Sequence, residues 1–156
     1  MKKFFTTKFL VQGAIIAALY ATLTIVLKTI SYGMVQFRIS EALVILPFFT
    51  PAAIPGLFLG CAISNLAGDF GILDVVIGST ATLIAAYMAY KIKKPVLVPL
   101  PAVVLNAFLV AIVLSVAGLP YWPSVLWVGL GQLVCAYGLG LPLLYILKRY
   151  RRKIFE

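Results

Sequence analysis

Histidine is absent from this chain, and only four of its 156 residues are acidic. Without histidine the chain lacks the commonest general base, the Ser-His-Asp and Cys-His arrangements of nucleophilic catalysis, and the usual zinc ligand sets. The two cysteines, Cys61 and Cys135, lie inside apolar runs and do not have the close spacing of a metal or redox motif. These absences predict a protein that is not an enzyme and that carries no cofactor and no metal.

Charged residues are also scarce, at 11% of the chain, whereas 63% of it is hydrophobic. Soluble domains are roughly half apolar and a quarter charged, so the composition predicts a multi-pass protein of the cell membrane. Each helical crossing takes about 20 apolar residues, so six crossings would use about 120 residues and leave no room for a soluble domain. We therefore expect one all-α membrane domain over residues 1–156.

Turn residues, prolines and charges divide the chain into six apolar segments. The expected membrane helices cover residues 9–30, 38–49, 54–66, 73–90, 96–117 and 124–147. The second helix is short for a full crossing, because it ends before the stretch 50–55, which contains two prolines.

Basic residues outnumber acidic ones by 13 to 4, an excess that is also found in proteins that bind nucleic acids or anionic surfaces. Eleven of the bases instead lie in three clusters at the ends of apolar segments: Lys2, Lys3 and Lys8; Lys91, Lys93 and Lys94; and Lys148, Arg149, Arg151, Arg152 and Lys153. Bases next to membrane helices stay cytoplasmic, and six crossings place all three clusters on one side. The pattern predicts cytoplasmic N- and C-termini in a lipid bilayer and no nucleic-acid partner.

Apart from Lys28, the charged side chains between the basic clusters converge on the outer side of the predicted bundle. Charged groups at membrane depth are costly and usually face the protein interior, a partner or water, so these four are candidates to bind a ligand: Arg38, Glu41, Asp69 and Asp74. Two alternatives remain open. Arg38 and Glu41 are three residues apart and could simply pair with each other, and the two aspartates could be solvated loop residues.

Amide and tryptophan side chains add to this group. The further candidates to bind the same ligand are Gln36, Asn65, Asn106, Trp122, Trp127 and Gln132. The amides serve equally well as hydrogen-bonding groups between helices, and Trp122 fits an aromatic belt at the membrane interface.

Small residues form stripes on two of the predicted helices, where helices in a membrane approach closely. The stripe on the third helix consists of Gly56, Gly60 and Ser64, and internal packing explains it. The stripe on the first helix consists of Gly13, Ala14, Ala17, Ala18 and Ala21. Internal packing and docking to a separate membrane subunit both account for this second stripe.

Three parts of the sequence together resemble the QueT family. They are the run QFRISEAL at residues 36–43, the run LPFFTPAAIPGLFLGC at residues 46–61, and Asp74 with the pair Gly78-Ser79. The resemblance extends over nearly the whole chain in length and six-helix layout. Members of this family are substrate-binding S components of energy-coupling-factor (ECF) transporters, assigned to the uptake of queuosine precursors.

The resemblance implies a subunit that captures a vitamin-like solute from outside and docks onto a transmembrane T subunit with two ATPases. Ala14 and Ala18 resemble the family's docking motif. Because the chain has no phosphate-binding loop, ATP hydrolysis is expected from the partner subunits.

The implied substrate is a 7-deazaguanine base, which presents adjacent N–H donors to an acceptor such as a carboxylate. Glu41 is the first choice to accept hydrogen bonds from this edge. Trp127 or Trp122 would stack on the ring, and Asp74 or Asp69 would bind an aminomethyl cation. Arg38 is expected to orient Glu41. The remaining donors and acceptors are assigned to Asn65, Gln36 and Gln132.

Three other readings of the sequence compete with this one. The chain could be an S component for another vitamin-like solute, or a scaffold or assembly subunit without a transport role. A membrane enzyme is a poorer alternative, since Asp69 and Asp74 have no third clustered ligand for a metal.

Overall fold

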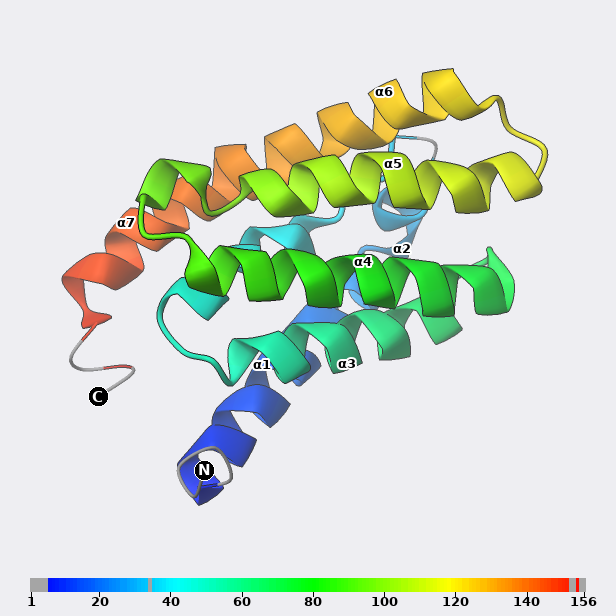
Figure 1. Cartoon of the computed structure of the whole chain (residues 1–156). Helices are drawn as coiled ribbons and strands as arrows, with labels where there is room; N and C mark the ends of the chain where they lie inside the picture. The colour runs from blue at the N-terminus through cyan, green and yellow to red at the C-terminus, as the bar shows by residue number, and fades with distance from the viewer. Residues whose placement is uncertain (1–5, 34, 152–153, 155–156) are drawn as a thin grey trace.

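The computed structural model describes residues 6–33, 35–151 and 154, and within these ranges every regular element is a helix (Figure 1). The prediction of an all-α protein is confirmed for this part of the chain. Four of the bases used to predict the topology, Lys2, Lys3, Arg152 and Lys153, lie outside the described residues.

The α-helices are α1 (Thr7–Val26), α2 (Lys28–Ser31), α3 (Ala53–Leu66), α4 (Gly71–Lys91), α5 (Leu100–Val116), α6 (Tyr121–Gln132) and α7 (Leu141–Arg149). Two 3-10 helices, η1 (Ile39–Phe48) and η2 (Pro95–Leu97), and the π-helical η3 (Leu133–Gly140) complete the described elements. Helix α6 begins three residues before the expected position 124. Prolines are tolerated in the first turn of a helix, so Pro123 does not prevent this earlier start.

Among the described residues, four continuous helical stretches are long and apolar enough to cross a membrane: Thr7–Val26, Gly71–Lys91, Pro95–Val116 and Tyr121–Arg149. The other two apolar helices are shorter. Helix α3 has 14 residues, which at 1.5 Å each extend about 21 Å. The 10 residues of η1 extend about 20 Å in the 3-10 form. Because the hydrocarbon core is about 30 Å thick, six full crossings stay a prediction.

The links between helices lie at two opposite ends of the bundle (Figure 1). The start of α1, the end of α7 and the link between α4 and α5 lie toward the left in this view, and the α3–α4 and α5–α6 links lie at the right. Lys93 and Lys94 of the α4–α5 link therefore share one end with the last turn of α7, which carries Lys148 and Arg149. This arrangement agrees with the charge pattern, and the orientation relative to the cytoplasm stays a prediction.

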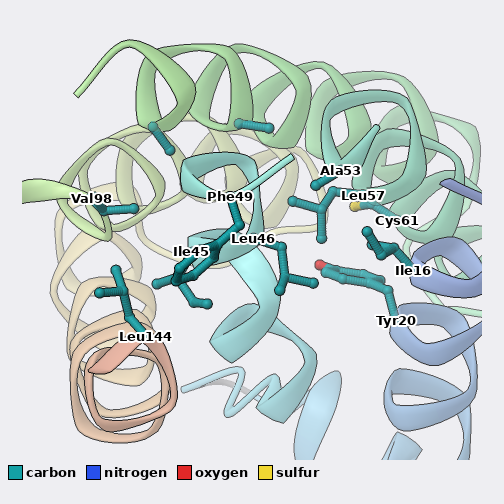
Figure 2. Packing of buried hydrophobic residues seen from close by; sticks show 12 residues of the cluster. Ile16, Tyr20, Ile45, Leu46, Phe49, Ala53, Leu57, Cys61, Val98 and Leu144 are labelled. Carbon is teal, nitrogen blue, oxygen red and sulfur yellow. The ribbon is translucent and has the colours of Figure 1, made fainter. Parts of the chain in front are cut away.

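The 3-10 helix η1 occupies the middle of the bundle. The chain-order neighbours α3, α4, α5 and α6 pack in succession and α1 packs on α3, while η1 contacts α1, α4 and η3. Its apolar residues Ile45 and Leu46 join Leu57 of α3 and Leu144 of α7 in the main hydrophobic core (Figure 2). Tyr20 of α1 belongs to the same core and points its hydroxyl inward. The residues at the start of η1 are thereby held in the interior.

Small residues allow α1 and α3 to touch. A Cβ atom on Gly60 would lie 2.8 Å from the backbone oxygen of Ala17, and one on Gly56 would lie 2.7 Å from that of Gly13. Internal packing is thus confirmed for the glycines of α3. It also accounts for Gly13 and Ala17 of the α1 stripe, whereas Ala14 and Ala18 of the same stripe are exposed.

Candidate ligand-binding site

Three charged side chains are buried around the start of η1: Arg38, Glu41 and Asp74, at 3%, 1% and 0% exposure. Arg38 directly precedes η1, and its Nη2 donates to Oδ2 of Asp74 at 3.3 Å. The Arg38 guanidinium also lies 5.0 Å from the ring centre of Tyr32, and its Nε donates to the backbone oxygen of Ser31 at 3.4 Å. The ion pair that forms is therefore Arg38–Asp74 and not the alternative pair of Arg38 with Glu41.

Glu41 lies in the first turn of η1 and is held by a residue that the sequence analysis missed. The hydroxyl of Tyr20 donates to Glu41 Oε1 at 2.5 Å, and Glu41 also interacts with the amides of Gln132 and Asn106. The second carboxylate oxygen, Oε2, has no hydrogen-bond partner. A signal for Tyr20 was available, because a tyrosine in the middle of an apolar membrane helix needs a partner for its hydroxyl.

Asp74 and Asn65 meet where α3 leads into α4. The Asn65 amide nitrogen donates to the backbone oxygen of Asp74 at 2.9 Å, which leaves Asn65 Oδ1 and Asp74 Oδ1 without partners. Gly78 follows one turn later on α4. A Cβ atom there would lie 2.7 Å from the Asn65 nitrogen and 3.1 Å from Asp74 Oδ1, so the missing side chain gives these groups room.

Gln36 has an unusual backbone conformation. Its φ angle is +49°, in the left-handed region that non-glycine residues rarely adopt. The segment is pressed against α6, since a Cβ atom on Gly131 would lie 2.1 Å from the backbone oxygen of Val35. The Gln36 side chain is buried, and its Nε2 has no partner. Strain of this kind is often retained at functional sites.

Unpaired polar atoms are concentrated in this region. In the part of the chain that the structure describes, the buried side-chain atoms without a hydrogen-bond partner are Ser31 Oγ, Gln36 Nε2, Glu41 Oε2, Asn65 Oδ1, Asp74 Oδ1, Ser79 Oγ and Gln132 Oε1. Buried polar groups are nearly always hydrogen-bonded, because leaving one unpaired costs about 1–3 kcal/mol. The cluster has the chemistry of a binding site whose ligand supplies the missing partners.

Most of the side chains singled out from the sequence are buried here, but some are not. The buried candidates are Gln36, Arg38, Glu41, Asn65, Asp74, Asn106 and Gln132. Asp69 instead forms an ion pair of 2.9 Å with Lys28, and its side chain is 68% exposed. Trp122 is 69% exposed and packs edge-on against Tyr121, and Trp127 is partly buried. These positions make Asp69 and Trp122 weaker candidates than the buried group.

The surface around Ala14 and Ala18 is apolar. Val11, Ile15 and Leu19 are also exposed along α1. Next to them, an apolar groove of about 350 Å³ is lined by residues of α1, η1 and α7. This surface is separate from the buried polar cluster.

Comparison with known proteins gives a family match over most of the chain. The model of the family described as QueT transporter matches residues 10–149. A curated protein of Lactococcus lactis subsp. cremoris (strain MG1363), named queuosine precursor transporter QueT, is 44% identical over 77 residues. The aligned region makes up 48% of this chain and 45% of that relative, so it spans less than half of the relative's length. No solved structure gives a significant match.

Proposed function

Because the chain belongs to the QueT transporter family, we propose that it captures a queuosine precursor at the outer face of the cell membrane. The ligand is a 7-deazaguanine base, and the chain serves as the substrate-binding S component of an ECF importer. The name of the Lactococcus relative supports the choice of substrate. The observation that carries the proposal is the cluster of buried, unpaired polar atoms around Glu41.

Glu41 binds the guanine-like edge of the base. Such an edge presents adjacent N–H donors, which a carboxylate accepts in pairs. Tyr20 donates to Oε1, and Oε2 is the carboxylate oxygen without a partner. The Tyr20 hydrogen bond also fixes the carboxylate orientation, which reduces the loss of side-chain freedom when the ligand binds.

The remaining polar side chains form hydrogen bonds with the other donors and acceptors of the base. Gln132 Oε1 and Gln36 Nε2 are an unpaired acceptor and an unpaired donor, and Asn106 lies beside Glu41. Trp127 is the preferred aromatic for stacking, because it is partly buried whereas Trp122 is largely exposed. Arg38 holds Asp74 in place through their ion pair.

Energy for uptake comes from other subunits. The sequence has no phosphate-binding loop, so ATP hydrolysis belongs to two ATPase partners that act through a transmembrane T subunit. Ala14 and Ala18 form the contact with the T subunit. Their exposure supports this assignment, because small side chains on an outer surface allow a partner helix to approach closely.

Ligand-dependent thermal stabilisation of the purified chain tests the proposal against a scaffold role. A ligand that binds only the folded state adds RT ln(1 + [L]/Kd), or about 2.7 kcal/mol at a concentration 100 times Kd. We expect 7-deazaguanines to raise the melting temperature, and adenine and unrelated vitamins to have no effect. A melting temperature that no deazaguanine changes would contradict the proposal, and a rise with another vitamin would identify an S component of different specificity.

A further inference from the structure

An apolar groove of about 350 Å³ lies between α1, η1 and α7, apart from the buried polar cluster. Leucine and isoleucine side chains form most of its lining, among them Ile15 and Leu19 of α1, Leu43 of η1, and Leu143 and Leu147 of α7. Ile15 and Leu19 are about half exposed. An exposed apolar surface of this kind marks contact with lipid or with a partner protein.

The size of the groove favours a lipid chain over a helix as its occupant. One turn of an α-helix with its side chains is roughly 10–12 Å wide and 5.4 Å long, so it takes up about 400–600 Å³, more than the whole groove. Helices in a membrane also approach closely where side chains are small, as at Ala14 and Ala18 beside the groove. The groove is lined by large branched side chains instead, which a thin, flexible acyl chain fits better.

The groove has one polar end and one apolar end. Gln12 and Thr50 lie at the polar end, where the Thr50 hydroxyl donates to Gln12 Oε1 at 3.0 Å. Leu19 lies two turns farther along α1, at the apolar end. From Lys8 to Leu19 the helix advances about 16 Å, and one leaflet of the hydrocarbon core is about 15 Å deep. Together with the preceding turn of α1, the groove therefore covers the depth of one leaflet.

Basic side chains lie beyond the polar end. Lys8 is one turn before Gln12 on α1, and Arg151 is one turn after Leu147. Residues four apart share a helix face, so both bases lie on the faces that line the groove. Both are exposed, and the start of α1 and the end of α7 lie at the same end of the bundle (Figure 1). None of the described acidic residues lines the groove, so its charge favours an anion.

We propose that this groove binds one anionic phospholipid, with an acyl chain between α1, η1 and α7 and the phosphate at Lys8 and Arg151. Basic pockets between membrane helices bind lipid headgroups in this way on the cytoplasmic side, where the charge pattern places this end of the bundle. The order of the groove, from leucines and isoleucines through Gln12 and Thr50 to the bases, matches the order of chain, ester and phosphate in a phospholipid. The inference goes beyond the proposed function, because it holds whatever solute the polar cluster binds.

The test compares two lipids with the same acyl chains, dioleoyl-phosphatidylglycerol and dioleoyl-phosphatidylcholine. Native mass spectrometry of the full-length protein in detergent measures the affinity for the first bound lipid. Each base near a membrane surface strengthens the attraction about fivefold, so two bases should favour phosphatidylglycerol about 30-fold. Glycerol 3-phosphate carries the phosphate without an acyl chain and should not bind measurably.

Two pairs of variants locate the site. Lys8→Gln/Arg151→Gln should lose the preference for phosphatidylglycerol, whereas the control Lys93→Gln/Lys94→Gln should keep it, because those two bases share the same end of the bundle but do not line the groove. Leu147→Trp fills the groove and should weaken binding of both lipids. Its control is Leu126→Trp, since Leu126 is an exposed residue of α6 outside the groove, and it should change neither affinity.

Four results would overturn the inference. The first is equal affinity of the unmodified chain for the two lipids, and the second is binding of glycerol 3-phosphate as tight as that of phosphatidylglycerol. The third is an equal loss of preference in the Lys93→Gln/Lys94→Gln control. The fourth is unchanged lipid binding by Leu147→Trp together with loss of self-association or of the T subunit, which would assign the groove to a protein. The comparison in the unmodified chain needs no substitution, so it stands even if a variant fails to fold.

Discussion

The Tyr20 hydroxyl donates a hydrogen bond of 2.5 Å to Oε1 of Glu41 in the interior of the bundle, and both side chains are buried. Tyr20 belongs to the main hydrophobic core, so this bond connects the core to the polar site (Figure 2). It fixes one oxygen of the carboxylate and leaves Oε2 unpaired. The position of Glu41 is thus set by α1, although Glu41 itself lies on η1.

Replacing Tyr20 with Phe tests whether this positioning matters for binding. The bond is present with and without ligand, so its loss acts on affinity through the cost of ordering the freed carboxylate, about 0.5–1.5 kcal/mol, and affinity for a 7-deazaguanine should fall about 2- to 12-fold. Isothermal titration measures the change. Tyr121→Phe is the control, because Tyr121 makes only an exposed bond of 3.4 Å to a backbone oxygen. Equal affinities of the two variants would show that the Tyr20 hydroxyl plays no part.

Replacing Gly131 with Ala tests the contact that holds Gln36 in the site. The added methyl group would lie 2.1 Å from the backbone oxygen of Val35, so the segment must move. We expect a loss of stability of about 1–3 kcal/mol from overpacking, together with weaker ligand binding as Gln36 is displaced. Gly138→Ala is the matched control, since nothing lies within 4 Å of its added methyl group. If both variants retain wild-type affinity, Gln36 does not contact the ligand.

Enlarging Ala14 and Ala18 to Leu separates docking from internal packing on α1. Both residues are exposed, so the purified double variant should stay folded and bind substrate normally, while co-purification with the T subunit and uptake should be lost. Gly60→Leu is the contrasting variant, because even a Cβ atom there lies 2.8 Å from the backbone oxygen of Ala17. That variant should lose stability and binding together, by about 1–3 kcal/mol.

Two results would refute the docking assignment. One is continued co-purification of the Ala14→Leu/Ala18→Leu variant with the T subunit and the ATPases. The other is a loss of substrate affinity in parallel with a loss of thermal stability, as for Gly60→Leu.

The predicted topology is tested by labelling single cysteines in intact cells with an impermeant thiol reagent, in a background without Cys61 and Cys135. Cysteines at positions 70 and 120 should react, and a cysteine at position 93 should be protected, since basic clusters stay cytoplasmic. Positions 2 and 152 should also be protected, although they lie outside the described residues. Strong labelling at 93 with none at 70 would invert the layout and place the proposed site on the wrong side.

The sequence predicted that the described elements are helices, because the signals for a helix are local, but the predicted helix 9–30 ends at Val26 and the predicted helix 38–49 is of the 3-10 type. The end of α3 at Leu66 follows from turn residues and small polar residues after an apolar run, and the structure ends the helix there. The burial of Glu41 and Asp74 could also be predicted, because charged side chains within apolar membrane segments usually face the protein interior.

Which side chains pair could not be predicted, because pairing depends on how distant segments pack. Arg38 is extended and not helical, so its spacing of three from Glu41 does not set their contact, and it reaches Asp74 of α4 instead. Tyr20 and Glu41 meet only after α1 packs beside η1. The left-handed conformation of Gln36 occurs where its segment packs closely against Gly131, a contact that no local pattern reveals.

The affinity of the Glu41→Gln variant for a 7-deazaguanine is the most direct test of the account. Glutamine keeps the shape of the side chain but replaces one acceptor with a donor and removes the charge, so the pair of N–H donors on the base loses its partner. We expect the variant to express and fold, and to bind about 10- to 150-fold more weakly than the unmodified chain. Unchanged affinity in a folded Glu41→Gln protein would contradict the claim that this buried carboxylate recognises the ligand.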